Sequence, residues 1–166
     1  MNPVSLVQHA MLAYYAGDAR RIQHFLKVYA YAKAIGELES LDAGTQFCLE
    51  IAALTHDIGI RNSERLYGSA SGAYQQLEGP PEAQRLLAAL PIDPAVTERV
   101  CWLIAHHHTY RDIQGLDYQI LVEADFLVNL VEDGLDAATA RHTGETLFKT
   151  QTGKFFLSCL YPSASE

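Results

Sequence analysis

The 166-residue sequence lacks any long apolar run. A membrane-spanning helix needs about 18 or more consecutive apolar residues, and no stretch approaches that length. The N-terminus, Met1 to Tyr15, also lacks the basic patch that precedes the apolar part of a secretory signal. We therefore expect a cytoplasmic protein with no membrane partner.

An excess of basic residues is also missing, because the formal net charge is -8. Nucleic-acid polymers and anionic lipids are bound through a basic stripe, which this composition does not supply. A small anionic molecule is still compatible with this charge if a metal ion or a nearby arginine offsets it. The sequence thus favours a small-molecule partner, and it is compatible with a homo-oligomer.

Closely spaced cysteines are absent as well. Cys48, Cys101 and Cys159 lie far apart, each in an apolar segment. None of their spacings is typical of a zinc or redox motif. We expect buried, reduced thiols rather than a disulfide.

What the sequence does contain is helical periodicity. Apolar residues make up 49% of the chain and recur at helical spacing, without a convincing strand, hairpin or repeat. The length suits one domain with its own core. We therefore predict an all-α, single-domain helical bundle over residues 1–166.

Capping residues and glycines predict where the helices begin and end. Gly59 is expected to take the left-handed conformation that ends a helix. Residues 60–81, rich in Gly, Ser and Tyr, are expected to form a loop with one helical turn near Ala73–Leu77. The predicted helices are Pro3–Tyr15, Asp18 to about Glu39, Ala43–Ile58, Pro81–Ala89, Pro94–His108, Asp117–Glu132, and Asp136 towards Tyr161.

Asp125 is the most informative single residue. Its helical neighbours Leu121, Val122 and Val128 are apolar, so its carboxylate should be buried. A buried ionised carboxylate is costly unless it is paired or bound to a metal. A structural ion pair and a helix cap are the alternatives to a metal ligand.

Three more side chains of the metal-ligand type lie on other predicted helices. His24 is in line with Val28 and Ile35 on the core-facing stripe, and the pair His56-Asp57 ends an apolar helix. Each feature alone is more often structural. Together they offer nitrogen and oxygen ligands from three inward-facing helices, as metal sites in helical bundles do.

The order of these motifs resembles the HD-domain superfamily of metal-dependent phosphohydrolases. The resemblance rests on the run from Arg21 through His24, on Thr-His56-Asp57-Ile-Gly59, and on Glu123-Ala-Asp125, and it covers about residues 19–130. It implies an all-α fold with a central metal site whose ligands are His24, His56, Asp57 and Asp125. It also implies hydrolysis of a phosphomonoester or phosphodiester, often nucleotide-like.

Dinuclear members of this superfamily bind a second metal through a histidine in the region of His106-His107-His108, where His107 is the best inward candidate. They also carry a histidine in a His-Pro-x-x-Gly-Ala-like segment, and Glu78 replaces it here. Glu78 is then a substitute ligand, a proton-transfer residue or a solvated charge. Many members have Lys after His-Asp-x-Gly, where this chain has Ile60, so Arg61 is the nearest residue able to hold phosphate.

The resulting expectation is metal-assisted hydrolysis of a small phosphorylated substrate. The ion lowers the pKa of a water, Asp57 orients that water, and His107 or His108 protonates the leaving oxygen or steadies negative charge. Mixed His and carboxylate ligands suit Mn, Fe, Co, Ni or Zn, with Mg possible, and one firmly bound ion is expected with a second left open. The alternatives are a di-iron oxygenase of the same fold and a non-catalytic binding or regulatory domain.

Overall fold

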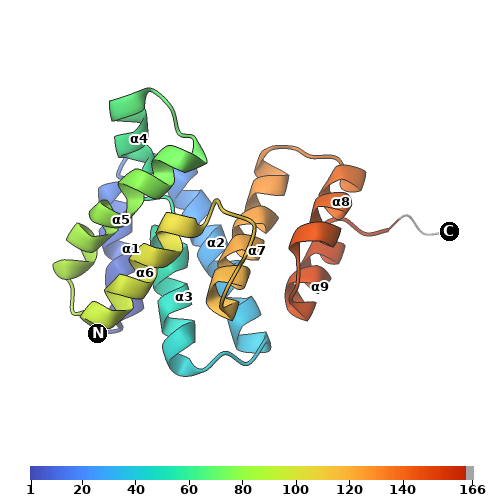
Figure 1. Cartoon of the computed structure of the whole chain (residues 1–166), viewed down its shortest axis with the longest axis horizontal. Helices are drawn as coiled ribbons and strands as arrows, with labels where there is room; N and C mark the ends of the chain where they lie inside the picture. The colour runs from blue at the N-terminus through green and yellow to red at the C-terminus, as the bar shows by residue number, and fades with distance from the viewer. Residues whose placement is uncertain (164–166) are drawn as a thin grey trace.

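The computed structural model describes residues 1–163 and confirms the all-helical prediction (Figure 1). Residues 164–166 of the predicted domain lie outside the described residues. Within 1–163 there are nine helices and no strand. Their bounds are α1 Pro3–Tyr14, α2 Ala19–Leu38, α3 Ala43–Thr55, α4 Ile60–Tyr67, α5 Gly72–Ala88, α6 Pro94–His106, α7 Leu116–Glu132, α8 Ala137–Leu147 and α9 Gln151–Leu160.

Most helices begin where a side chain caps the free backbone N–H groups of the first turn. The Asp18 carboxylate, for example, accepts a hydrogen bond from the backbone N–H of Arg21 at 3.1 Å. Such caps satisfy donors that have no partner within the helix. The other side-chain caps are Asn2, Asp42, Asp93, Asp136 and Thr150.

Helices α2, α3 and α7 pack against one another and form the centre of the bundle (Figure 1). Helix α1 and helix α6 both pack on α3, and α5 lies along α6. On the other side, α9 packs on α7 and pairs with α8. The fully buried apolar side chains come mainly from the three central helices, so any polar group that these helices turn inward lies in a low-dielectric interior.

The prediction of a loop at residues 60–81 is wrong, because most of this segment is helical. Helix α4 begins directly after Gly59, and α5 begins at Gly72 and continues through Pro80 and Pro81. Proline is expected to interrupt a helix because it lacks an N–H donor. Here α5 packs along α6, and this tertiary contact outweighs the local signal.

The predicted role of Gly59 is also wrong, because its φ of -75° is right-handed. Gly59 is needed for a different reason. A Cβ at Gly59 would lie 2.6 Å from the backbone nitrogen of Gly79, so the two glycines allow α5 to approach the end of α3 closely. This contact places the first turn of α5 beside the His56-Asp57 turn.

Two further predictions change in detail. The segment from Asp136 towards Tyr161 is two helices, separated at Phe148–Thr150. The three cysteines are free thiols as expected, but Cys48 and Cys101 are only half-buried and Cys159 is exposed, so the expected burial is wrong. Among residues 1–163, no helix is long and apolar enough to cross a membrane.

Candidate metal centre

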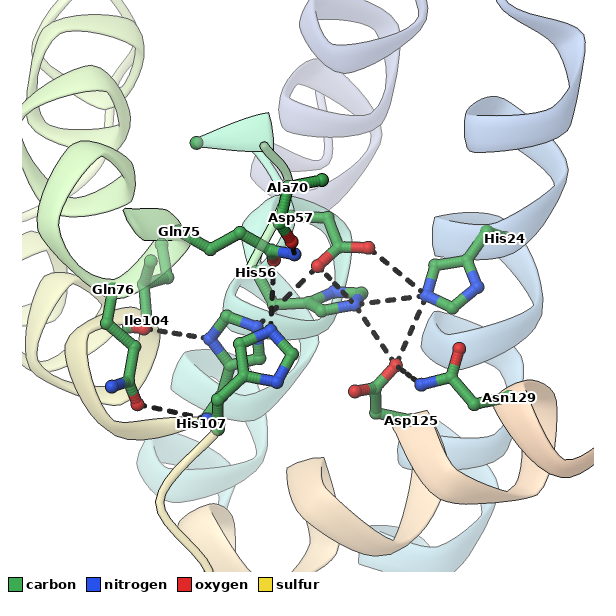
Figure 2. A network of polar contacts seen from close by, with 12 residues as sticks. His24, His56, Asp57, Ala70, Gln75, Gln76, Ile104, His107, Asp125 and Asn129 are labelled. Atoms are coloured by element: carbon green, nitrogen blue, oxygen red, sulfur yellow. Dashed lines mark hydrogen bonds and ion pairs between the residues drawn. The ribbon is translucent and has the colours of Figure 1, made fainter. Parts of the chain in front are cut away.

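The structure brings the four predicted metal ligands together in the middle of the bundle (Figure 2). His24 comes from α2, His56 and Asp57 follow α3, and Asp125 comes from α7. The Nε2 atom of His24 lies 3.2 Å from Oδ1 of Asp125 and 3.3 Å from Oδ2 of Asp57. The Nε2 atom of His56 lies 3.5 Å from a carboxylate oxygen of each aspartate.

These separations fit donors from His24, His56 and Asp57 around one ion, with Asp125 beside both imidazole nitrogens. Ligand atoms about 2.0–2.2 Å from a metal are about 2.9–3.5 Å from one another in octahedral or tetrahedral geometry. The Nε2 atoms of His24 and His56 are also only 3.3 Å apart. Two imidazole nitrogens and two carboxylates that converge in this way need positive charge between them, either as protons or as a metal ion, so the donor set suits a cation.

The outward nitrogens of the histidines are held by oxygen acceptors, which orients the inward nitrogens. His56 Nδ1 donates to the carbonyl oxygen of Ala53 at 2.8 Å, and His107 Nδ1 donates to that of Ile104 at 2.8 Å. With Nδ1 as the donor, the Nε2 of the neutral ring carries the free lone pair. Metal-binding histidines are usually held in this way.

Glu132 and Asn129 complete the centre, and sequence reasoning missed both. His24 Nδ1 donates to Oε2 of Glu132 at 3.0 Å, and Asn129 Nδ2 donates to Oδ1 of Asp125 at 2.9 Å. Asn129 stands four and Glu132 seven residues after Asp125, and this spacing could have identified them, because such positions share one face of α7.

Replacing Glu132 by alanine is expected to lower metal affinity about 10–100-fold, the usual cost of losing the partner of a metal-binding histidine. His24 would keep its place on α2, but its ring would lose the acceptor that orients it. Metal titration of the purified variant measures the change. Glu132→Gln, which keeps an oxygen acceptor, should retain most of the affinity; an unchanged affinity in Glu132→Ala would contradict this role.

The histidines and aspartates of the centre shift one another's pKa values. Burial lowers the pKa of His56, but Asp57 and Asp125 outweigh burial and raise it to about 9. Burial raises the pKa of Asp57, but the neighbouring histidines, His56 foremost, outweigh it and lower it to about 2. The cluster therefore holds its carboxylates ionised and attracts positive charge.

The three consecutive histidines, His106 to His108, point in different directions. His107 is 1% exposed, and its Nε2 atom has no hydrogen-bond partner among the described residues and points to Asp57 Oδ1 at 3.6 Å. His106 stacks on Trp102 and lies apart from the centre. Asp57, His107 and His108 can offer three donor atoms within 4.8 Å of one another, a second candidate ligand group that shares Asp57 with the first.

A cleft of about 630 Å³ opens over the centre. His24, Asp57 and Asp125 lie at its floor, and His108 also lines it. Burial lowers the pKa of His108 to about 4, and the charge of the neighbouring His107 is the next largest cause of this decrease. Of the three histidines, His108 is the one whose side chain lines the cleft. With this pKa its ring is neutral near pH 7.

Two predicted site residues are not brought into this cleft. The Arg61 guanidinium lies over the Tyr14 ring, 4.7 Å from its centroid, because the first turn of α4 directs it towards α1. The basic residues that line the cleft are Arg20 and Arg21 of α2 instead. Arg21 is paired with Asp18 at 2.9 Å, whereas Arg20 has no ion pair within residues 1–163.

Glu78 also lies outside the cleft. Its carboxylate accepts a hydrogen bond from the Tyr67 hydroxyl at 2.8 Å. Because this segment is a helix, the register of α5 decides which side chain faces the centre, and that side chain is Gln75. Gln75 stands four residues before Gly79, the position of the histidine in His-Pro-x-x-Gly, so this spacing could have identified it.

The backbone of the His56-Asp57 turn is held by α1. The Tyr15 hydroxyl donates to the carbonyl oxygen of Asp57 at 2.7 Å, and the Tyr15 side chain is 1% exposed. The Tyr14 hydroxyl donates to the carbonyl oxygen of Ile58 at 3.4 Å. The carbonyl of Asp57 also accepts from the backbone N–H of Ile60 at 3.1 Å, so the tyrosine bonds add to the local turn and fix it against the bundle.

Comparison with known proteins agrees with this architecture. The model of the HD domain family matches residues 21–138. The fold is similar to the crystal structure of a predicted HD superfamily hydrolase from an uncultured Thermotogales bacterium, with a TM-score of 0.65 and 26% sequence identity, over 93% of this chain and 83% of that one. No curated protein matches the sequence. The family match spans well over half of the chain, and this protein therefore belongs to the HD domain family of metal-dependent hydrolases.

Proposed function

We propose that this protein hydrolyses a small phosphomonoester or phosphodiester, with nucleotide-like compounds among the candidates. The observation that carries the proposal is the convergence of His24, His56, Asp57 and Asp125 on the floor of a cleft that also contains arginine. Carboxylate and imidazole donors hold the ion, and guanidinium groups bind phosphate oxygens.

A divalent ion bound here would lower the pKa of a water and polarise a P–O bond. Asp57 directs its carboxylate to the same space from the end of α3 and can orient the attacking water. Arg20, exposed at the cleft and without an ion pair in the described residues, can hold the phosphate. His108 also lines the cleft, where its ring contacts Gln75 and Tyr110.

The test combines metal analysis with a substrate panel. Purified protein is analysed for bound metal, stripped with a chelator, and assayed for phosphate release from phosphomonoesters, phosphodiesters and nucleotides with Mn, Co, Ni or Mg added. We expect turnover of at least one phosphoester class that disappears on stripping and returns with metal. A metal-loaded protein that releases no phosphate from any of these classes would contradict the proposal.

A second candidate function is oxidation of a substrate by a di-iron centre. It is favoured by the second ligand group, Asp57, His107 and His108, which shares Asp57 with the first. Iron content and oxygen consumption distinguish the two functions, because hydrolysis requires neither iron nor oxygen. A non-catalytic binding domain is less well supported, because all four ligands are present and converge.

A further inference from the structure

Both ring nitrogens of His108 already have partners. Its Nε2 atom lies 3.0 Å from Oε1 of Gln75, and its Nδ1 atom lies 3.2 Å from the Tyr110 hydroxyl. The backbone N–H of His108 donates to Oε1 of Gln76 at 3.1 Å. The ring of this candidate metal ligand is therefore held by two polar contacts, and its backbone by a third, from α5 and from the segment after α6.

The orientation of the Gln75 amide decides where the proton on His108 lies. Gln75 is 7% exposed, and its Nε2 atom donates to the carbonyl oxygen of Ala70 at 2.8 Å (Figure 2). The amide oxygen must then face His108, so His108 Nε2 carries the proton and donates it. His108 Nδ1 is left as the acceptor for Tyr110.

The ring of His108 also has little room to turn. A Cβ at Gly72 would lie 2.8 Å from the Cγ atom of His108, so the ring lies directly against the backbone at the start of α5. On its other side, the ring centroids of His107 and His108 are 3.9 Å apart. The hydrogen bonds from Gln75 and Tyr110 therefore act on a side chain that packing already confines.

We infer that Gln75 restricts this protein to one firmly bound metal ion by engaging the Nε2 atom of His108, which lies within reach of Asp57 and His107 but directs its proton to the Gln75 amide oxygen. With His108 engaged, only Asp57 and His107 remain for a second ion, whereas metal sites in proteins usually use three or more protein ligands. The amide oxygen of Gln75 is also a poor replacement for imidazole with transition metals. This inference rests on the metal centre of the proposed function, and it favours hydrolysis over a di-iron reaction.

The test is metal stoichiometry in Gln75→His. Apo protein is titrated with Mn²⁺, and bound metal is measured after desalting, with electron paramagnetic resonance to detect coupling between neighbouring ions. Wild type is expected to keep about one ion per chain and Gln75→His about two, because an added imidazole supplies the missing donor. Gln75→Glu, closer in size to the native residue, provides a second gain-of-ligand variant if Gln75→His does not fold.

Gln84→His is the matched control, because it makes the same exchange at an exposed position of α5. Its stoichiometry should remain that of wild type. Two tightly bound ions in wild type, or one ion in both folded Gln75 variants, would overturn the inference while leaving the metal centre in place. A wild type that binds no metal at all would instead overturn the proposed function.

Discussion

Replacing Asp125 by alanine is expected to abolish metal binding and phosphoester hydrolysis together. Asp125 is 3% exposed, and its Oδ1 atom lies 3.2 Å from His24 Nε2 and 3.5 Å from His56 Nε2. The variant loses one of four donors and the negative charge that draws a cation into a buried site. The loss of affinity should exceed the about 10–100-fold that follows from losing an outer partner of a ligand.

Two variants separate the ligand role of Asp125 from its role in packing. Asp125→Asn keeps the shape of the side chain but removes its charge, so it should fold and still bind metal poorly. Glu98→Gln removes an exposed carboxylate of α6 and controls for net charge. Metal titration, phosphate release and circular dichroism are compared across the set. Full metal content and turnover in Asp125→Ala would refute the assignment of this ligand.

Replacing Glu123 by alanine is expected to destabilise the fold by about 3–5 kcal/mol, because several buried donors lose their acceptor at about 1–3 kcal/mol each. Glu123 is fully buried on the side of α7 opposite Asp125. Its carboxylate accepts hydrogen bonds from the backbone N–H groups of Lys149 at 2.6 Å and Thr150 at 3.0 Å, and from the Gln119 amide at 2.7 Å. Without it, these buried donors lose their partner and α9 loses its attachment to α7.

Urea denaturation followed by circular dichroism measures this loss. Glu123→Gln keeps the volume and one acceptor, so it should cost less than Glu123→Ala. The matched control Glu98→Ala, at an exposed position of α6, should change stability by less than about 0.5 kcal/mol. Metal stoichiometry should stay that of wild type in folded Glu123→Ala. A stability change no larger than that of Glu98→Ala would show that the carboxylate does not hold the α8–α9 hairpin.

Helix positions were largely predictable because their signals are local. Asp18, Asp42 and Asp136 cap helices where the sequence suggested that helices begin, and Gly115 and Gly134 take positive φ values of 94° and 66° at predicted breaks. The exception is residues 60–81. There the packing of α5 on α6 and the approach of Gly79 to Gly59 outweigh the glycine and proline signals, and no nearby residue reports such a contact.

The sequence by itself determined the helical class, the inward face of each central helix and therefore the burial of Asp125, because periodicity fixes the face of a helix that a side chain occupies. Only the tertiary structure decided which side chains meet at that face. It placed Gln75 rather than Glu78 beside His108, Arg20 and Arg21 rather than Arg61 in the cleft, and Glu132 behind His24. The physical reason is that spacing along the chain gives a direction from one helix axis, whereas a site depends on the packing of several helices.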